Sequence, residues 1–242
     1  MFLILHKPRL ASVLAAIIFV SALLLAACNG DNKPSDETSS QPSSQVTDAK
    51  PIETIDAFIN NAKIDKSKPD WKTTLPEPPE LTFNSNENYY WDLNTNKGKI
   101  TILFKPEVAP MHVSNAIYLI RLGFYDGIIF HRVIPGFMAQ GGDPLGTGNG
   151  NPGYVFDGEF KGASHNKIGI LSTANAGPGT DGSQFFITFK PVTRLDGGYT
   201  VYGEMVDGFD TLKELEKFGS KPYGTTTEKL AIISAAIRVE PK

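Results

Sequence analysis

The strongest constraint on the fold is a series of short segments in which apolar and polar residues alternate. Every second residue is apolar in residues 89–93, and the same period resumes in residues 100–104 after a polar turn. A period of two is typical of β-strands with one buried face, so these two segments predict a hairpin. Five further strands are predicted from similar patterns, at residues 128–134, 168–172, 184–189, 199–205 and 232–239.

Helical spacing is found in only two segments of this C-terminal region. The first begins at Pro110, which a first helical turn tolerates, and carries apolar residues three and four positions apart up to Gly123. The second covers residues 212–218 and ends at Gly219. Many short strands with two helices favour an antiparallel β-barrel or sandwich over a fold of alternating strands and helices.

The N-terminus has the three parts of an export signal in residues 1–27. Lys7 and Arg9 precede an apolar run at residues 10–25, and small residues then precede the single cysteine, Cys28. This order resembles the lipobox of bacterial lipoproteins, in which the thiol is acylated and cleavage makes the cysteine the first residue. A retained membrane anchor is the alternative. We expect Cys28 to be lipidated and to hold the protein on the extracytoplasmic face of the cell membrane.

Residues 28–80 are expected to form a tether between this anchor and a domain at residues 81–242. Residues 29–50 are almost wholly polar and cannot offset the entropy of ordering, which predicts a flexible segment. A short amphipathic helix is possible within residues 51–66. Trp71 and Leu75 are expected to pack on the surface of the domain. A chain that begins near Lys68 should therefore fold as stably as the mature chain.

Composition excludes several classes of protein. The net charge of −3 is unlike that of a basic nucleic-acid-binding protein, so no nucleic-acid partner is expected. One cysteine cannot form an internal disulfide or a cysteine-rich zinc site, and the four histidines lack metal-type spacing. The glycine-rich stretch at residues 141–150 lacks the Gly-Lys-Ser/Thr end of a phosphate-binding loop. No nucleophile, metal site or cofactor motif is predicted.

Three sequence blocks do carry a specific signal. They are Phe130-His-Arg-Val-Ile-Pro-Gly-Phe-Met-Ala-Gln-Gly-Gly-Asp143, Leu171-Ser-Thr-Ala-Asn-Ala-Gly-Pro178 and Gly182-Ser-Gln-Phe-Phe-Ile-Thr188. Together they resemble the cyclophilin-type peptidyl-prolyl cis–trans isomerases over about residues 81–239. The resemblance implies an eight-stranded antiparallel β-barrel capped by two α-helices, a mainly β fold that agrees with the strand pattern. The run Gly123-Phe-Tyr-Asp-Gly127 is similar to the compact bacterial branch of the family.

The resemblance also implies a set of site residues. Arg132 matches the family's catalytic arginine, and Gln140 and Asn175 match groups that hydrogen-bond the substrate backbone. The remaining matches line the proline pocket and its groove: Phe137, Met138, Phe186, Leu195, Ala174 and Ala176. No cofactor is implied, and the expected partner is a proline-containing polypeptide. We expect the protein to be a monomer.

Two positions depart from the family pattern. Arg194 stands where a tryptophan is frequent, and Tyr199 stands where many members have the pocket histidine. Loss of the tryptophan predicts weak binding of cyclosporin. The tyrosine keeps a polar tip on a ring, so isomerase activity is still expected.

The residues alone leave simpler interpretations open. Within residues 184–189, Phe186 falls on the polar face, opposite the apolar residues that would fill a barrel, as a pocket residue would. Phe137 and Met138 could be ordinary core residues. Arg132 could form a structural ion pair, His131 could be structural, and Asn175 could be a turn residue with left-handed backbone.

Two functional hypotheses follow from this sequence. The first is an isomerase that accelerates X–Pro isomerisation in exported proteins at the membrane surface. The second is a non-catalytic docking or holdase module that binds proline-containing segments in the same groove. The presence of Arg132 favours the enzyme, because binding alone does not require a donor for the transition state.

Overall fold

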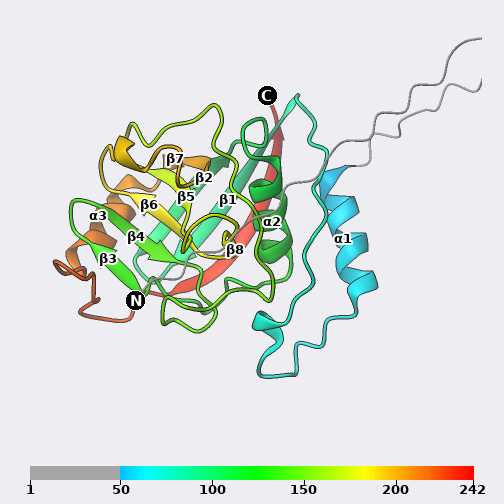
Figure 1. Cartoon of the computed structure of the whole chain (residues 1–242), viewed down its shortest axis with the longest axis horizontal. Helices are drawn as coiled ribbons and strands as arrows, with labels where there is room; N and C mark the ends of the chain where they lie inside the picture. The colour runs from blue at the N-terminus through cyan, green and yellow to red at the C-terminus, as the bar shows by residue number, and fades with distance from the viewer. Residues whose placement is uncertain (1–49) are drawn as a thin grey trace, which may run out of the picture. The chain divides into compact units, whose positions relative to one another are not determined.

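The computed structural model describes residues 50–242, all of which belong to one compact unit. The signal, Cys28 and the polar segment up to residue 49 lie outside the described residues. Figure 1 shows the elements along the chain. They are, in order, α1 (Pro51–Ala62), η1 (Trp71–Thr73), β1 (Glu87–Thr95), β2 (Gly98–Phe104), α2 (Pro110–Arg121), β3 (Arg132–Ile134), β4 (Met138–Gly141), β5 (Ile170–Thr173), β6 (Phe185–Thr188), η2 (Thr193–Leu195), β7 (Val201–Asp207), α3 (Phe209–Lys217) and β8 (Ile232–Pro241).

The strands form one antiparallel sheet, which confirms the predicted mainly β, eight-stranded fold. Their order is β3-β4-β6-β5-β7-β2-β1-β8, and β3 and β8 are not paired with each other. Instead, Ile129 forms an isolated bridge with Ala231, and the Phe130 N–H donates to the Leu230 carbonyl at 2.9 Å. The predicted strand at residues 128–134 is therefore divided, because its first half pairs toward β8 and only Arg132–Ile134 joins β4.

Aromatic rings fill the space between the sheet and α2. The Trp91 ring centroid lies 4.9 Å from that of Tyr125 and 5.0 Å from that of Phe185, and Phe130 packs edge-on against Phe185. These side chains come from strands and loops far apart in the sequence. Their burial fixes which face of β6 is internal, so Phe185 points into the core and its neighbour Phe186 points to the other face.

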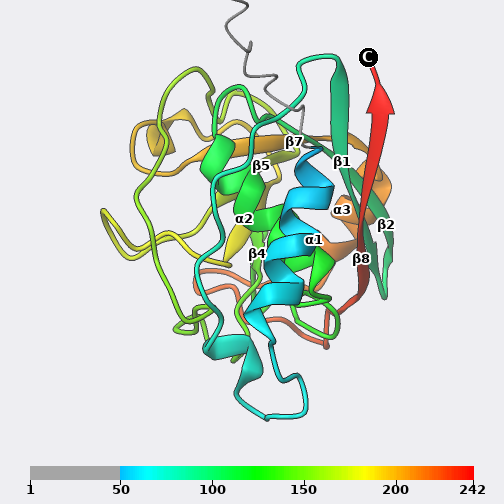
Figure 2. The same cartoon turned by 90° about the vertical axis from the view of Figure 1, so that its right-hand side faces the viewer.

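A third α-helix, α1, lies outside the predicted pair and packs on α2. Ile55 is fully buried, and the Phe58 ring meets the Tyr118 ring edge-on at 5.5 Å. The Arg121 guanidinium donates to both carboxylate oxygens of Asp56, at 2.8 and 2.6 Å. Figures 1 and 2 show α1 running along the outer side of α2. The possible helix in residues 51–66 is thus present as Pro51–Ala62.

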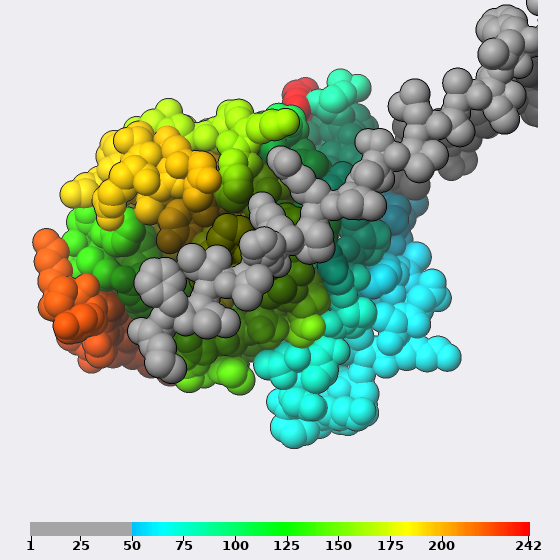
Figure 3. All heavy atoms as spheres, in the orientation of Figure 1, coloured from blue at the N-terminus to red at the C-terminus, as the bar shows by residue number. Residues whose placement is uncertain are grey.

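Residues 50–80, called the arm below, contact the core at several points. Trp71 packs edge-on against Phe124, with ring centroids 6.5 Å apart, and Leu75 is buried. The Leu75 N–H donates to the Pro152 carbonyl at 2.9 Å. The predicted packing of Trp71 and Leu75 is confirmed. The packed unit therefore begins before the predicted domain boundary at residue 81, and Figure 3 shows the arm in cyan against the rest of it.

Among residues 50–242, no helix combines the length and the hydropathy needed to cross a bilayer. The same residues contain no cluster of three or more His, Cys, Asp or Glu side chains that could hold a metal ion.

Candidate active site

Strand register places four side chains in one row across the sheet. Arg132 on β3 faces Gln140 on β4, Gln140 faces Phe186 on β6, and Phe186 faces Ser172 on β5. Residues directly opposite each other in antiparallel strands point to the same face. Phe185 occupies the opposite face, in the core. The period of two along β6 thus puts Phe186 directly beside Gln140, on the same face of the sheet as Arg132.

Apolar side chains surround this row. Met138 lies two residues before Gln140 on β4, so it shares the face, and both Met138 and Phe186 are buried. Phe137 stands in the tight turn between β3 and β4, and its N–H donates to the Ile134 carbonyl at 2.9 Å. The Phe186 ring meets Tyr199 edge-on, with centroids 5.9 Å apart. Met138, Phe186 and Tyr199 therefore form an apolar surface next to Gln140 on the face of the sheet that carries Arg132.

The Arg132 guanidinium is held by two neutral acceptors. Its Nε donates to the Tyr223 carbonyl at 3.3 Å, and one terminal nitrogen donates to Gln140 Oε1 at 3.2 Å. Arg132 forms no ion pair with any described carboxylate, and its other terminal nitrogen has no partner within residues 50–242. An arginine carries five N–H donors and stays charged at all physiological pH values. The site therefore presents an uncompensated positive charge with free donors.

A loop at residues 219–225, called the edge loop, fixes this arginine from the outer side of β3. The Val133 N–H donates to the Gly224 carbonyl at 2.8 Å, and the Ser220 N–H donates to the Val133 carbonyl at 3.1 Å. Gly224 has φ of +85°, and a Cβ atom there would lie 2.7 Å from Arg132 Cγ. Only glycine fits this approach without moving the arginine. The edge loop is the orange segment at the left of Figure 3.

A chain of amides connects Arg132 to the glycine-rich loop. Gln140 Nε2 donates to Gln184 Oε1 at 3.0 Å, and Gln184 Nε2 donates to the carbonyls of Gly148 and Gly150 at 3.0 and 2.9 Å. The glycines are held in turn by Asp143, which is buried. The side chain of Gln140 thus has its orientation set from both sides.

The Asp143 carboxylate organises the loop by accepting backbone N–H groups. It accepts from Leu145 at 2.7 Å, from Thr147 at 2.8 Å and from Gly148. Burial alone would raise the pKa of Asp143, but these backbone donors hold it below its ordinary value. The sequence block around Arg132 ends on this residue, whose role is to shape the groove.

A groove of about 300 Å³ opens beside Gln140. Asn175 lies at its side, and its amide Nδ2 donates to the Gly198 carbonyl at 3.0 Å while Oδ1 accepts from the Gly177 N–H. The backbone N–H and carbonyl of Asn175 have no partner among the described residues and are free to pair with an extended peptide. Other predicted residues line the same groove: Ala174 and Ala176.

The two histidines near the row are placed differently. The His165 ring stacks on Phe186 with centroids 5.8 Å apart, and its nitrogens face Asp196 and Ser172 at 2.6 and 2.9 Å. His131 lies against Gly148, and its ring nitrogens have no partner among residues 50–242. Burial lowers the pKa of His131, so it is neutral near pH 7 and adds no second charge beside Arg132.

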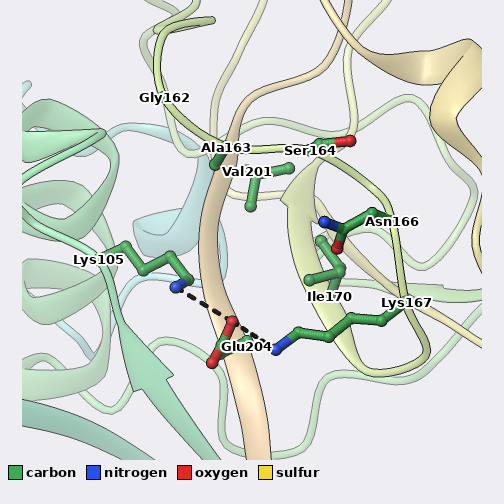
Figure 4. A pocket seen from close by; sticks show the side chains of 9 residues that line it. All are labelled: Lys105, Gly162, Ala163, Ser164, Asn166, Lys167, Ile170, Val201 and Glu204. Atoms are coloured by element: carbon green, nitrogen blue, oxygen red, sulfur yellow. Dashed lines mark ion pairs between the residues drawn. The ribbon is translucent and has the colours of Figure 1, made fainter.

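A second hollow lies away from this row, between the 162–167 loop and strands β5 and β7. Its volume is about 560 Å³. Figure 4 shows Lys105 and Lys167 reaching Glu204 from opposite sides, and both ammonium groups contact Glu204 Oε2, at 3.0 and 2.9 Å. None of the predicted site residues lines it. Because both lysines pair with Glu204, this hollow offers one cation in excess, and Ile170 and Val201 form part of its lining.

Comparison with known proteins decides the family. The sequence model described as "Cyclophilin type peptidyl-prolyl cis-trans isomerase/CLD" matches residues 90–237. The chain belongs to the cyclophilin-type peptidyl-prolyl cis–trans isomerases. The arm lies outside the matched residues, so α1 is an addition to the part that the family shares.

Relatives of several kinds carry this domain. The chain is 45% identical over 148 residues to peptidyl-prolyl cis-trans isomerase ppi1 of Schizosaccharomyces pombe, covering 60% of this chain and 96% of that protein. It is 44% identical over 156 residues to peptidyl-prolyl cis-trans isomerase-like 2 of Cryptococcus neoformans, where the match covers 62% of this chain and 27% of the relative. The chain therefore spans only about a quarter of that longer protein.

Solved structures show the same fold. A Cryptosporidium parvum cyclophilin type peptidyl-prolyl cis-trans isomerase, crystallised in the presence of the dipeptide Ala-Pro, is 36% identical with a TM-score of 0.59. It covers 62% of this chain and 98% of that chain. A second structure of the same protein gives a TM-score of 0.60 at 34% identity, covering 64% of this chain and 99% of that chain.

The structure brings most of the predicted site residues together. Those placed on the row or around it are Arg132, Phe137, Met138, Gln140, Phe186 and Tyr199. Leu195 ends η2, and its carbonyl accepts from the Tyr199 N–H at 3.2 Å. The interpretation of Arg132 as a structural ion pair is wrong, because no described carboxylate pairs with it. Asn175 does not have left-handed backbone, since Lys63 is the one described non-glycine residue with positive φ. Cys28 lies outside the described residues.

Sequence reasoning missed three contributors to the site. Gln184 carries the amide chain, Asp143 organises the loop, and the Tyr223 carbonyl holds Arg132. Gln184 and Asp143 stand in the sequence blocks quoted above, where a polar residue beside apolar ones indicates a role in the site. Tyr223 contributes a backbone atom from 91 positions away, and no side-chain pattern reveals such a contact.

Proposed function

We propose that this chain catalyses cis–trans isomerisation of X–Pro peptide bonds in extended polypeptides. The observation that carries the proposal is Arg132, a half-buried guanidinium with free donors, no carboxylate partner within residues 50–242, and the apolar side chains of Met138 and Phe186 on the same face of the sheet. Family membership supports the proposal. No cofactor is needed, because the reaction makes and breaks no covalent bond.

The chemistry requires a lower barrier to rotation about one amide bond. Delocalisation of the nitrogen lone pair sets that barrier at about 18–20 kcal/mol, and uncatalysed exchange takes tens to hundreds of seconds. An acceleration of about 10⁵ removes roughly 7 kcal/mol. In the twisted transition state the proline nitrogen becomes pyramidal and accepts a hydrogen bond. The free N–H groups of Arg132 donate to it, which supplies about 1.5–3 kcal/mol.

The remaining stabilisation comes from holding the substrate on both sides of the rotating bond. The proline ring fits against Phe137, Met138 and Phe186, while the preceding carbonyl swings. The free backbone groups of Asn175 pair with the peptide on the groove side. Interactions that are stronger in the twisted state than in the planar state raise the rate.

The proposal is tested by exchange spectroscopy on a proline-containing peptide, with the wild type and Arg132→Ala. The variant should lower kcat/KM by about 10²–10³, which corresponds to roughly 2.7–4 kcal/mol of lost transition-state stabilisation. Peptide affinity should fall much less, because the apolar wall is intact. Lys68→Gln, which removes a charge from the exposed arm, is the control and should leave the rate unchanged.

The same experiment separates catalysis from docking. A wild type that binds the peptide but does not accelerate its exchange would make the chain a binding module and would overturn the proposal. Phe137→Ala gives an independent check, because loss of part of the wall should weaken binding as well as turnover.

We propose further that the protein is exported and acts at the membrane surface through lipidated Cys28. The support is the sequence order of basic residues, apolar run, small residues and cysteine. Cys28→Ser offers no thiolate for acyl transfer, so the precursor should stay unlipidated and uncleaved, which a gel shows as a longer chain without lipid label. A variant that matures and partitions into detergent like the wild type would refute this location.

A further inference from the structure

We propose that the rim of the proline pocket selects substrates with an acidic residue close to the proline, and that Arg194 makes this selection. The inference rests on the proposed function and adds a substrate class to it. It starts from the position at which this chain departs from the family pattern, where an arginine replaces an aromatic side chain.

Arg194 is fixed at the rim by its contact with the pocket wall. It lies in η2, and its guanidinium carbon is 4.8 Å from the centre of the Phe137 ring. Stacking on an aromatic face orients the planar guanidinium while its edges stay in solvent. Arg194 is exposed and forms no ion pair with any residue in the described range 50–242. Its N–H donors are therefore available to a substrate that binds over the pocket.

The carboxylates closest to Arg194 along the chain and around Phe137 already accept hydrogen bonds from other groups. Asp196 accepts from the Ser164 hydroxyl at 2.6 Å and from the His165 N–H at 2.8 Å. Glu216 accepts from the Gly136 N–H, one residue before Phe137, at 2.6 Å. Each is occupied by a donor of its own, so neither neutralises Arg194 by direct contact.

Further unpaired cations stand on the segments that adjoin the pocket. Lys190 follows Phe189, whose N–H donates to the Phe137 carbonyl at 2.9 Å, and Lys221 lies in the edge loop. Both lysines are exposed and neither has an ion-pair partner among the described residues. Together with Arg132 and Arg194, these lysines place four positive charges on segments that adjoin the pocket, in a chain whose net charge is −3. A groove of one sign attracts segments of the opposite sign.

The expected preference is modest because Arg194 is exposed. A surface ion pair contributes about 0.2–1 kcal/mol, so kcat/KM should favour an acidic substrate by about 1.4- to fivefold. Screening should remove this preference at high salt, because the Debye length falls from about 8 Å at 0.15 M to about 3 Å at 1 M.

The test uses peptides that differ in one residue, Glu, Gln or Lys, placed in turn at the two positions before and the two positions after the proline. For each peptide, kcat/KM is measured by exchange spectroscopy and affinity by titration. At one or more positions the wild type should rank Glu above Gln and Gln above Lys. Arg194→Gln should bring the Glu/Gln ratio to about one, Arg194→Lys should retain part of it, and Arg194→Glu should reverse the order.

Lys68→Gln is the matched control, because it removes the same charge from the arm and should leave every ratio unchanged. Equal values for Glu, Gln and Lys peptides at all four positions, in rate and affinity, would overturn the inference. So would a preference that persists in Arg194→Gln. If the wild type accelerates none of the peptides, the proposed catalysis fails, while the affinities still decide the charge preference.

Discussion

Truncation of one side chain in α1 tests whether the arm belongs to the folded unit. Ile55 is fully buried, on the side of α1 that meets α2, and Phe58 and Tyr118 pack beside it. Replacing a buried isoleucine with alanine loses the transfer free energy of the removed carbons and leaves a cavity, which together cost about 2–5 kcal/mol. Domains of this size lose about 2–4 °C in Tm per kcal/mol, so Ile55→Ala should lower Tm by about 4–20 °C.

The measurement is thermal and urea unfolding followed by near-ultraviolet circular dichroism, with Asn60→Ala as the matched control. Asn60 lies on the exposed side of the same helix, so its replacement should change the free energy of unfolding by less than about 0.5 kcal/mol. A single transition that moves to lower temperature in Ile55→Ala shows that α1 unfolds with the sheet.

Equal stability of the Ile55→Ala and Asn60→Ala variants would refute this reasoning and would make α1 an independent appendage. The contacts of the arm also reverse the sequence-based expectation for a chain that begins near Lys68. Such a chain lacks α1 and exposes the outer face of α2, so it should unfold at a lower temperature than the mature chain.

Three further outcomes are expected. Asp143→Asn weakens the hydrogen bonds that hold the glycine-rich loop, so it should lower the free energy of urea unfolding by about 1.5–3 kcal/mol. Folding lowers the pKa of Asp143, so the wild type should lose this stability as the pH falls through the lowered pKa. The variant should show no such loss. Gly224→Ala should push Arg132 aside and lower kcat at least tenfold, whereas Gly127→Ala, which also has positive φ but no atom within 4 Å of the added carbon, should reduce stability alone. Arg194→Trp should strengthen inhibition by cyclosporin in a competition assay, and nanomolar inhibition of the wild type would contradict the alignment of this position.

The period of two was enough to predict most of the sheet, because burial of one face selects alternate side chains. It placed Phe185 and Phe186 on opposite faces of β6, which is how the structure has them. It could not divide residues 128–134, since the change of partner at Arg132 depends on hydrogen bonds to residues about 90–100 positions away. The sequence of the arm predicts a tether, because prolines and charged residues outnumber the few apolar side chains that anchor it.

The candidate site was predictable to the extent that its members carry distinctive side chains. Arg132, Gln140 and Phe186 stand in motifs that resemble a family, and the register joins them in one row. What holds Arg132 was not predictable, because the Tyr223 carbonyl is a backbone atom that any residue could supply. The same holds for the close approach of Gly224, which depends on backbone conformation.

The edge loop affects whether another polypeptide can pair with the edge of the sheet. β3 is the last strand of the sheet, and an uncovered edge strand is a template on which an extended polypeptide can add as a further strand. Here the outward N–H and carbonyl of Val133 are already bonded to Gly224 and Ser220. An extended polypeptide therefore cannot add to the sheet as a further strand beside Arg132. The edge loop therefore protects this end of the sheet from strand pairing with another polypeptide.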